Sequence, residues 1–278
     1  MGPVLLALIA AAGYGVSDFV GGVAARRVAA LRVVLVSYPL SVLLVAVVAP
    51  FVGGRVELGS LLWGAAAGAT AGLAVWWFYL ALAAGPMSVV SPLTAVLVAG
   101  LPLLFATARG ERPGGWALVG AGLALVAVVL VSREGPSAVP FTRRVALLTV
   151  GSGTAFAAYF VLLHQVQSGT GLWPLLASRV AAAAVVLAAA VVAGQVRLPA
   201  GVPLRLALLA GVLDVVANTA FLFAVQGGLL SLVSVITALY PAATVVLAAV
   251  VLGERTARVQ QVGMVLAAAS VALIAAQG

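Results

Sequence analysis

The chain alternates between long apolar stretches and short polar interruptions that are rich in Gly, Pro and Arg. An α-helix needs about 20 apolar residues to cross the hydrocarbon core of a bilayer, and the apolar stretches have this length. The pattern predicts ten transmembrane helices, at residues 4–23, 32–51, 61–83, 88–107, 115–131, 145–165, 173–193, 204–225, 230–252 and 259–276. The predicted fold class is therefore an all-α membrane protein with ten transmembrane helices.

The composition supports membrane insertion and narrows the function classes. Apolar residues make up 65% of the chain and charged residues 7%, and the mean hydropathy is +1.28, far outside the range of soluble domains. No polar segment is long enough for a soluble catalytic domain, so we expect a protein that is not an enzyme and carries no cofactor. The first apolar stretch lacks a basic leader and a cleavage site, so it is interpreted as a retained helix.

Residues that bind metals or nucleic acids are sparse. The chain has no Cys, which excludes disulfides and thiolate metal sites, and its single His, His164, has no second ligand in view. The net charge is +8, but the Arg residues are scattered over short loops and form no basic face for a phosphate backbone. We therefore expect no metal and no nucleic acid. The expected partners are the lipid bilayer, a small-molecule substrate and, if transport is coupled, a proton.

The basic residues also indicate the source of the chain. Lys is absent beside 14 Arg, and Ala, Val, Leu and Gly dominate, which is typical of a GC-rich genome. We expect a multi-pass protein of a bacterial inner (plasma) membrane, either as a monomer or as a homodimer.

A repeat within the sequence predicts how the ten helices are arranged. Residues 78–132 align with residues 221–275 without a gap and share 20 of 55 positions, where this composition gives roughly seven by chance. Both segments contain Gly-Glu-Arg followed by a further glycine, as Gly110-Glu111 with Gly120 and as Gly253-Glu254 with Gly263. The alignment predicts two related units of five helices, in residues 1–137 and 138–278.

Because five is odd, the second unit enters the membrane from the opposite side, and the two units form an inverted repeat. Each Gly-Glu-Arg segment lies between two predicted helices, so structural turns are expected at Gly110, Glu111, Gly253 and Glu254. Each carboxylate is expected at the N-terminus of the helix that follows it, where the helix dipole favours negative charge. Inverted repeats often place a binding site at the middle of the membrane and open it to either side in turn, which is alternating access.

The second unit resembles the EamA family of the drug/metabolite transporter superfamily. The resemblance rests on a glycine turn at 227–228, a Ser-rich helix start, Tyr240-Pro241 within the ninth helix and Gly253-Glu254 before the tenth. The first helix, GYGVSDFVGGVAARR, is also similar to the opening helix of that family, although Tyr14 and Asp18 replace the usual Trp and Asn. The resemblance implies export or exchange of small metabolites through a central cavity, lined mainly by predicted helices 1, 3, 4, 6, 8 and 9.

Two acidic residues lie inside predicted helices, where a carboxylate costs about 2.5–3.5 kcal/mol to insert. Asp214 shares a helix face with Asn218, and Asp18 shares a face with Tyr14, because each pair is four residues apart. If these faces line a cavity, either carboxylate can bind a substrate ammonium or carry a proton. The alternatives are that Asp18 reaches interfacial water or Arg26, and that Asp214 pairs with a residue of a neighbouring helix.

Other polar and aromatic residues are candidates for substrate binding or coupling. Arg179 lies about six residues into its predicted helix, where it either extends to the lipid headgroups or recognises an anionic group of the substrate. A stripe of small hydroxyl residues recurs in both units and serves either close helix packing or the transport path; it includes Ser91, Thr94, Ser234 and Thr237. The remaining candidates are aromatic residues too deep for an interfacial belt, namely Trp76, Tyr159 and Tyr240.

Prolines lie inside two of the predicted helices that match in the repeat. Pro92 and Pro102 interrupt the fourth predicted helix and Pro241 interrupts the ninth, and interrupted helices often mark a binding site or a hinge. Because these positions do not coincide in the alignment, the two helices need not bend alike.

The predicted function is a secondary transporter of a small metabolite such as an amino acid, acting as an exporter or an exchanger. The alternatives are a multidrug exporter and a non-transporting membrane scaffold. Two indications of orientation disagree. Most Arg residues lie in loops opposite the termini, which places both termini outside by the positive-inside rule, whereas the family resemblance implies cytoplasmic termini.

Overall fold

The computed structural model describes residues 2–133, 140–253 and 256–276, and these ranges are helical apart from short connections. The helices are α1 (Gly2–Ala25), α2 (Ala30–Val52), α3 (Leu58–Ala84), α4 (Met87–Ala108), α5 (Gly115–Val131), α6 (Arg143–His164), α7 (Trp173–Val192), α8 (Val202–Gly227), α9 (Leu230–Thr237), α10 (Tyr240–Leu252) and α11 (Arg258–Ala275). No strand occurs in the described residues.

The helices have the lengths that a membrane requires. In the described residues, nine apolar helical stretches are long enough to cross a bilayer, with α9 and α10 taken together, and α5 is a shorter apolar helix of 17 residues. Each predicted helix begins and ends within three residues of an observed boundary. The prediction of an all-α, multi-pass membrane protein is therefore confirmed.

The ninth predicted span consists of two helices, whereas the fourth is continuous. α9 ends at Thr237 and α10 begins at Tyr240. Pro241 has no amide hydrogen and cannot donate to the carbonyl of Thr237, so the helix is interrupted there. α4 contains Pro92 and Pro102 but remains one helix, so the expected interruption of the fourth span was wrong. The two matched spans therefore differ in this structure: the fourth is one helix and the ninth is two.

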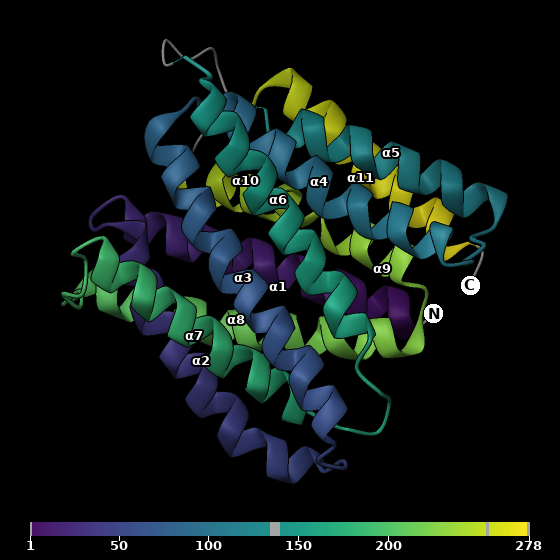
Figure 1. The fold of residues 1–278 in the computed structure, drawn as a ribbon. Helices are drawn as coiled ribbons and strands as arrows, with labels where there is room; N and C mark the ends of the chain where they lie inside the picture. The colour runs from purple at the N-terminus through teal and green to yellow at the C-terminus, as the bar shows by residue number, and fades with distance from the viewer. Residues whose placement is uncertain (1, 134–139, 254–255, 277–278) are drawn as a thin grey trace.

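Most of the close helix packing joins the first five helices to the later ones (Figure 1). α1 packs against α8 and α3 against α6, while α2 packs against α8 and α3 against α7. α5 and α11 pack against each other, α4 packs against α6, and a smaller contact joins α1 to α10. The start of α1, the end of α11 and the turn after α4 lie at one end of the bundle, called the termini end below. The turn after α10 lies at the opposite end (Figure 1).

Two glycines allow backbones to touch where α3 meets α7 and where α8 meets α2. A Cβ atom at Gly211 would lie 2.9 Å from the carbonyl oxygen of Ser37. A Cβ atom at Gly68 would overlap the carbonyl group of Ser178. Any larger residue would push these helices apart, so the glycines set the distance between them.

The crossing of α5 and α11 is built in the same way. A Cβ atom at Gly120 would lie 2.9 Å from Cγ1 of Ile274, and one at Gly263 would lie 2.8 Å from the amide nitrogen of Val131. The hydroxyl of Ser270 also donates to the carbonyl oxygen of Gly120 at 2.7 Å. The two glycines that follow the Gly-Glu-Arg segments therefore serve close helix packing.

Candidate functional site

A buried ion pair joins α7 to α8 inside the bundle. Nη1 of Arg179 donates to Oδ2 of Asp214 at 2.9 Å, and the two side chains are 3% and 19% exposed. Arg179 therefore does not extend to the lipid headgroups. Its charge is balanced within the bundle by Asp214, which is the arrangement that makes a buried charge tolerable.

Asn218 connects this ion pair to two tyrosines. Its amide oxygen accepts hydrogen bonds from Nη2 of Arg179 at 3.0 Å, from the hydroxyl of Tyr14 at 2.7 Å and from the hydroxyl of Tyr159. Its amide nitrogen donates to the backbone carbonyl of Asp214 at 2.7 Å and to Oδ1 of Asp214 at 2.9 Å. Since every donor and acceptor of the amide is matched, the network fixes its orientation. The sequence-predicted residues Tyr14, Tyr159, Arg179, Asp214 and Asn218 thus form one polar cluster.

The guanidinium of Arg179 lies between aromatic rings of α2 and α6. Its Cζ atom is 5.8 Å from the ring centroids of both Tyr38 and Tyr159, within the range of a cation–π interaction. Nη2 also donates to the hydroxyl of Tyr159 at 3.1 Å. The Nε atom is buried and has no hydrogen-bond partner in the described residues, so one donor of the guanidinium is not used.

Asp18 of α1 lies near this cluster but is not bonded to it. Its side chain is exposed and makes no hydrogen bond or ion pair with the described residues. Asp214, Tyr79 and Tyr240 are within electrostatic range of its carboxyl group. These neighbours belong to α8, α3 and α10, so the carboxyl group lies on the side of α1 that faces these helices.

The predicted hydroxyl stripe is mostly buried. Thr94 of α4 and Thr237 of α9 are 2% and 0% exposed, and neither side-chain oxygen has a hydrogen-bond partner in the described residues. Ser234 donates to the carbonyl oxygen of Ser231 in its own helix at 3.3 Å, as small hydroxyl residues commonly do, and Ser91 is partly buried. The stripe is therefore mostly buried in this conformation, and two of its hydroxyls have no hydrogen-bond partner among the described residues.

The other predicted aromatic residues do not join the polar cluster. Trp76 of α3 packs with Tyr38 and Tyr79 against a group of buried residues of α2 and α7, namely Leu31, Val34, Leu35, Val186, Ala189 and Ala190. Tyr240 begins α10, and its carbonyl oxygen lies against α1, where a Cβ atom at Gly15 would be 2.5 Å away. Tyr240 therefore lies near Asp18, and Trp76 packs beside Tyr38 without reaching the polar cluster.

Glu111 lies at the turn after α4, as predicted, but its carboxylate does not bind the helix that follows it. Its oxygens accept hydrogen bonds from the backbone amides of Leu230 and Ser231 at 3.0 Å each, and from the hydroxyl of Ser231 at 2.6 Å. The carboxylate therefore caps α9 and not α5, which corrects the expectation from the sequence. The positive end of the α9 dipole accounts for the attraction.

Both predicted glycine turns have backbone conformations that favour glycine. The φ angle is 99° at Gly110 and 66° at Gly253, in the left-handed region that other residues rarely adopt. Glu254, the fourth predicted turn residue, lies outside the described residues.

The two ends of the bundle differ in how tightly matched segments are packed. At the termini end, α9 packs against α4, and seven of its eight residues are buried. Towards the opposite end, no residue of α10 is buried. α9 is therefore enclosed by its neighbours, whereas α10 packs closely only against α1, where Tyr240 lies against Gly15.

Two residues of the site were missed in the sequence. Tyr38 flanks the guanidinium of Arg179, and Ser41 donates to Oδ2 of Asp214 at 3.4 Å. Both lie in α2, which carries no acidic residue that would mark it as a helix of the polar site. A signal was nevertheless available, because Ser37-Tyr38 and Ser178-Arg179 occupy matching places in the second helix of each predicted unit.

Residues 143–276 match the family model described as the EamA-like transporter family, and the match contains Tyr159, Arg179, Asp214 and Asn218. No curated protein matches the chain in sequence. One solved crystal structure is similar over 99% of this chain and 96% of its own chain, with a TM-score of 0.81 and 15% sequence identity. At that identity the likeness shows a shared fold and nothing about the ligand.

Proposed function

We propose that the chain is a secondary exporter or exchanger of a small metabolite such as an amino acid, because residues 143–276 match the model of the EamA-like transporter family. The observation that carries this proposal is the buried cluster of Arg179, Asp214 and Asn218 beside the accessible carboxylate of Asp18. Helices from both predicted units supply these residues, as expected for a site between two moving halves.

The packing supports an inverted repeat of residues 1–137 and 138–278. Under the predicted match of the two units, the contact of α1 with α8 corresponds to that of α6 with α3, and the contact of α3 with α7 corresponds to that of α8 with α2. Individual contacts follow the same rule. Gly120 contacts Ile274, and Gly263 contacts Val131. In the alignment Gly120 matches Gly263 and Val131 matches Ile274, each pair 143 positions apart, so the two contacts are equivalent.

The difference between the two ends supports alternating access. If the units are related by a two-fold axis, the close packing of α4 with α9 at the termini end has a counterpart between α4 and α10 at the opposite end. That counterpart is loose, since α10 has no buried residue. The described conformation is therefore proposed as one closed at the termini end and open at the opposite end, with Asp18 accessible from the opening.

The charges suggest separate roles for the two carboxylates. Asp214 is paired with Arg179 and holds it in place, whereas Asp18 has no cation among the described residues to balance it. An unpaired carboxylate within a membrane helix is costly unless a cation or proton neutralises it. Asp18 is therefore proposed as the group that binds a proton or a substrate ammonium. The unused Nε of Arg179 and the hydroxyls of Tyr14 and Tyr159 are proposed to bind the polar end of the substrate.

Counterflow of radiolabelled metabolites in proteoliposomes tests the proposed function. We expect a limited set of small zwitterionic compounds, amino acids among them, to exchange across the vesicle membrane. Uptake of large hydrophobic cations alone would show a multidrug exporter instead. No exchange of any compound, with the purified protein correctly folded, would favour a non-transporting scaffold.

Because the chain has no cysteine, introduced cysteines give a clean test of alternating access. Ala106 and Leu230 line one pocket of about 420 Å³ at the termini end, on α4 and α9. A short bifunctional thiol reagent that joins Ala106→Cys to Leu230→Cys should stop exchange, while each single variant treated with the same reagent should remain active. Undiminished exchange by the cross-linked protein would contradict the mechanism.

A further inference from the structure

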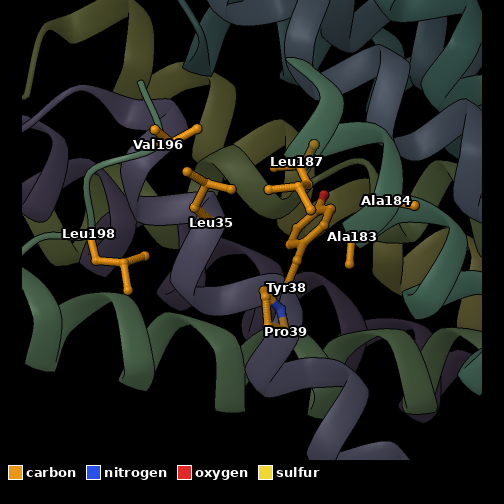
Figure 2. Close-up of a pocket in the computed structure, with 9 residues that line it drawn as sticks. Leu35, Tyr38, Pro39, Ala183, Ala184, Leu187, Val196 and Leu198 are labelled. Atoms are coloured by element: carbon orange, nitrogen blue, oxygen red, sulfur yellow. The ribbon is translucent and has the colours of Figure 1, made fainter. Parts of the chain in front are cut away.

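Two pockets of the described residues differ in what lines them. The groove between α2 and α7 is lined by apolar side chains and the ring of Tyr38, and by no charged residue (Figure 2). A second pocket, of about 420 Å³, lies at the termini end and is lined by both Arg109 and Glu111, next to residues of α6 and α9. No residue of the buried polar cluster lines it. The termini-end pocket is therefore a separate place where a charged small molecule can bind.

The guanidinium of Arg109 lies against an apolar wall of this pocket. Its Cζ atom is 5.4 Å from the ring centroid of Phe105, which lines the same pocket, and this is the range of a cation–π interaction. Arg109 is exposed and forms no ion pair with the described residues. The donors of its guanidinium are thus available to an anionic group of a ligand.

The carboxylate of Glu111 is held at another wall. It accepts hydrogen bonds from the amides of Leu230 and Ser231 and from the hydroxyl of Ser231, and Leu230 also lines the pocket. A carboxylate offers about four acceptor positions, so one remains. Although Arg109 and Glu111 line one pocket, they do not pair with each other. Two separate anchors, the Phe105 ring and the start of α9, hold the opposite charges apart.

We propose that the termini-end pocket binds a free α-amino acid, with its carboxylate at Arg109 and its ammonium at Glu111. A ligand that carries both charges satisfies both groups, whereas an ion of either sign is repelled by one of them. Phe105, Ala106 and Leu230 offer apolar contact to the side chain of the ligand. An amino acid with an apolar side chain, such as leucine, is therefore the matching occupant.

Occupancy of this pocket has a consequence for transport. An ammonium at the remaining acceptor position of Glu111 neutralises part of the charge that attracts the N-terminus of α9, and so weakens the cap. An amino acid on the termini side thus favours release of α9 and opening of that end. This consequence rests on the proposed function, whereas the binding itself does not.

The single histidine of the chain, His164, lines the same pocket and provides a local reporter. A full chain labelled in histidine gives one imidazole signal by nuclear magnetic resonance in detergent micelles. Titration with L-leucine at constant pH should shift this signal to saturation. Arg109→Gln should raise the half-saturating concentration about tenfold, because it removes a charge-assisted bond to the carboxylate. Arg112→Gln is the matched control and should bind like the parent, because Arg112 is an exposed arginine of the same turn that does not line the pocket.

Two analogues of leucine test each charge of the ligand. Leucinamide keeps the ammonium and lacks the carboxylate, while isocaproate keeps the carboxylate and lacks the ammonium. Each should bind about tenfold more weakly than L-leucine. Equal affinity for isocaproate would show a site for anions, equal affinity for leucinamide would show a site for cations, and either result would overturn the proposal.

The proposal would also be overturned if L-leucine gave no saturable shift, or if Arg109→Gln left the titration unchanged. None of these outcomes depends on a transport measurement. The proposed function is decided separately by counterflow, so failure of one can be told from failure of the other.

Discussion

Asp18 and Asp214 lie in the same interior region but differ in their partners, and this difference leads to a transport prediction. Replacing Asp18 with Asn keeps its shape and removes its charge. We expect Asp18→Asn to exchange substrate down its gradient but to lose accumulation driven by a pH gradient, because the proposed proton acceptor is gone. Uptake into proteoliposomes with and without a pH step measures both properties.

Asp214→Asn serves as the comparison for Asp18→Asn. It removes the partner of Arg179, so we expect weaker exchange and lower stability and not a selective loss of coupling. If Asp18→Asn still accumulates substrate when a pH gradient is imposed while Asp214→Asn does not, the proposed roles of the two carboxylates are reversed.

The ion pair itself leads to a prediction about stability. Arg179→Met leaves the Asp214 carboxylate buried without its cation and should lower the unfolding free energy by about 3–5 kcal/mol. The double variant Arg179→Met/Asp214→Leu removes both charges and should recover most of that loss. Thermal unfolding in detergent provides the measurement. A double variant as unstable as the sum of the two single variants would show that the two residues do not act as a pair.

The cap that Glu111 places on α9 leads to a prediction about one helix. The carboxylate joins the turn after α4 to the start of α9, and hydrogen bonds to a charged group contribute about 1.5–3 kcal/mol each. Glu111→Ala should therefore loosen α9 at the termini end. Ser234 is fully buried in α9, so a Ser234→Cys reporter should react with a water-soluble thiol reagent about tenfold faster when Glu111 is replaced.

Glu57 provides a matched control for Glu111. It also caps a helix, because it accepts a hydrogen bond from the backbone amide of Ser60 at 2.9 Å, but this cap lies within the start of α3. Glu57→Ala should leave the reactivity of Ser234→Cys unchanged. Equal acceleration by both substitutions would indicate general loosening and not release of α9.

The whole molecule is expected to have a second conformation in which the two ends exchange their packing. Spin labels at the exposed positions Val89 of α4 and Val250 of α10 report the opposite end, and labels at Leu104 and Leu229 report the termini end. Addition of substrate should shorten the first distance and lengthen the second in the same molecules, because one site cannot be open to both sides. Pulsed electron spin resonance measures both distances. Movement of both in the same direction would contradict alternating access.

Local features of the chain were predictable from the sequence. The limits of the ten predicted spans follow from apolar length alone, because each transmembrane helix satisfies its own backbone hydrogen bonds. The interruption at Pro241 also has a local cause, the missing amide hydrogen. Pro92 and Pro102 show the limit of this reasoning, since α4 continues through both of them and the local sequence does not reveal which prolines neighbouring helices tolerate.

The tertiary structure decided which polar residues meet. Tyr14 and Asn218 are 204 positions apart, and Glu111 caps a helix 119 positions later, so no spacing rule connects them. The sequence identified Arg179 and Asp214 as costly residues in apolar helices but left open what each one contacts. Their pairing depends on the crossings of α7 and α8 with the helices around them, which close glycine contacts set. Insertion cost is a property of one helix and can be read along the chain, whereas neutralisation of a charge requires a partner that only the packed bundle brings within reach.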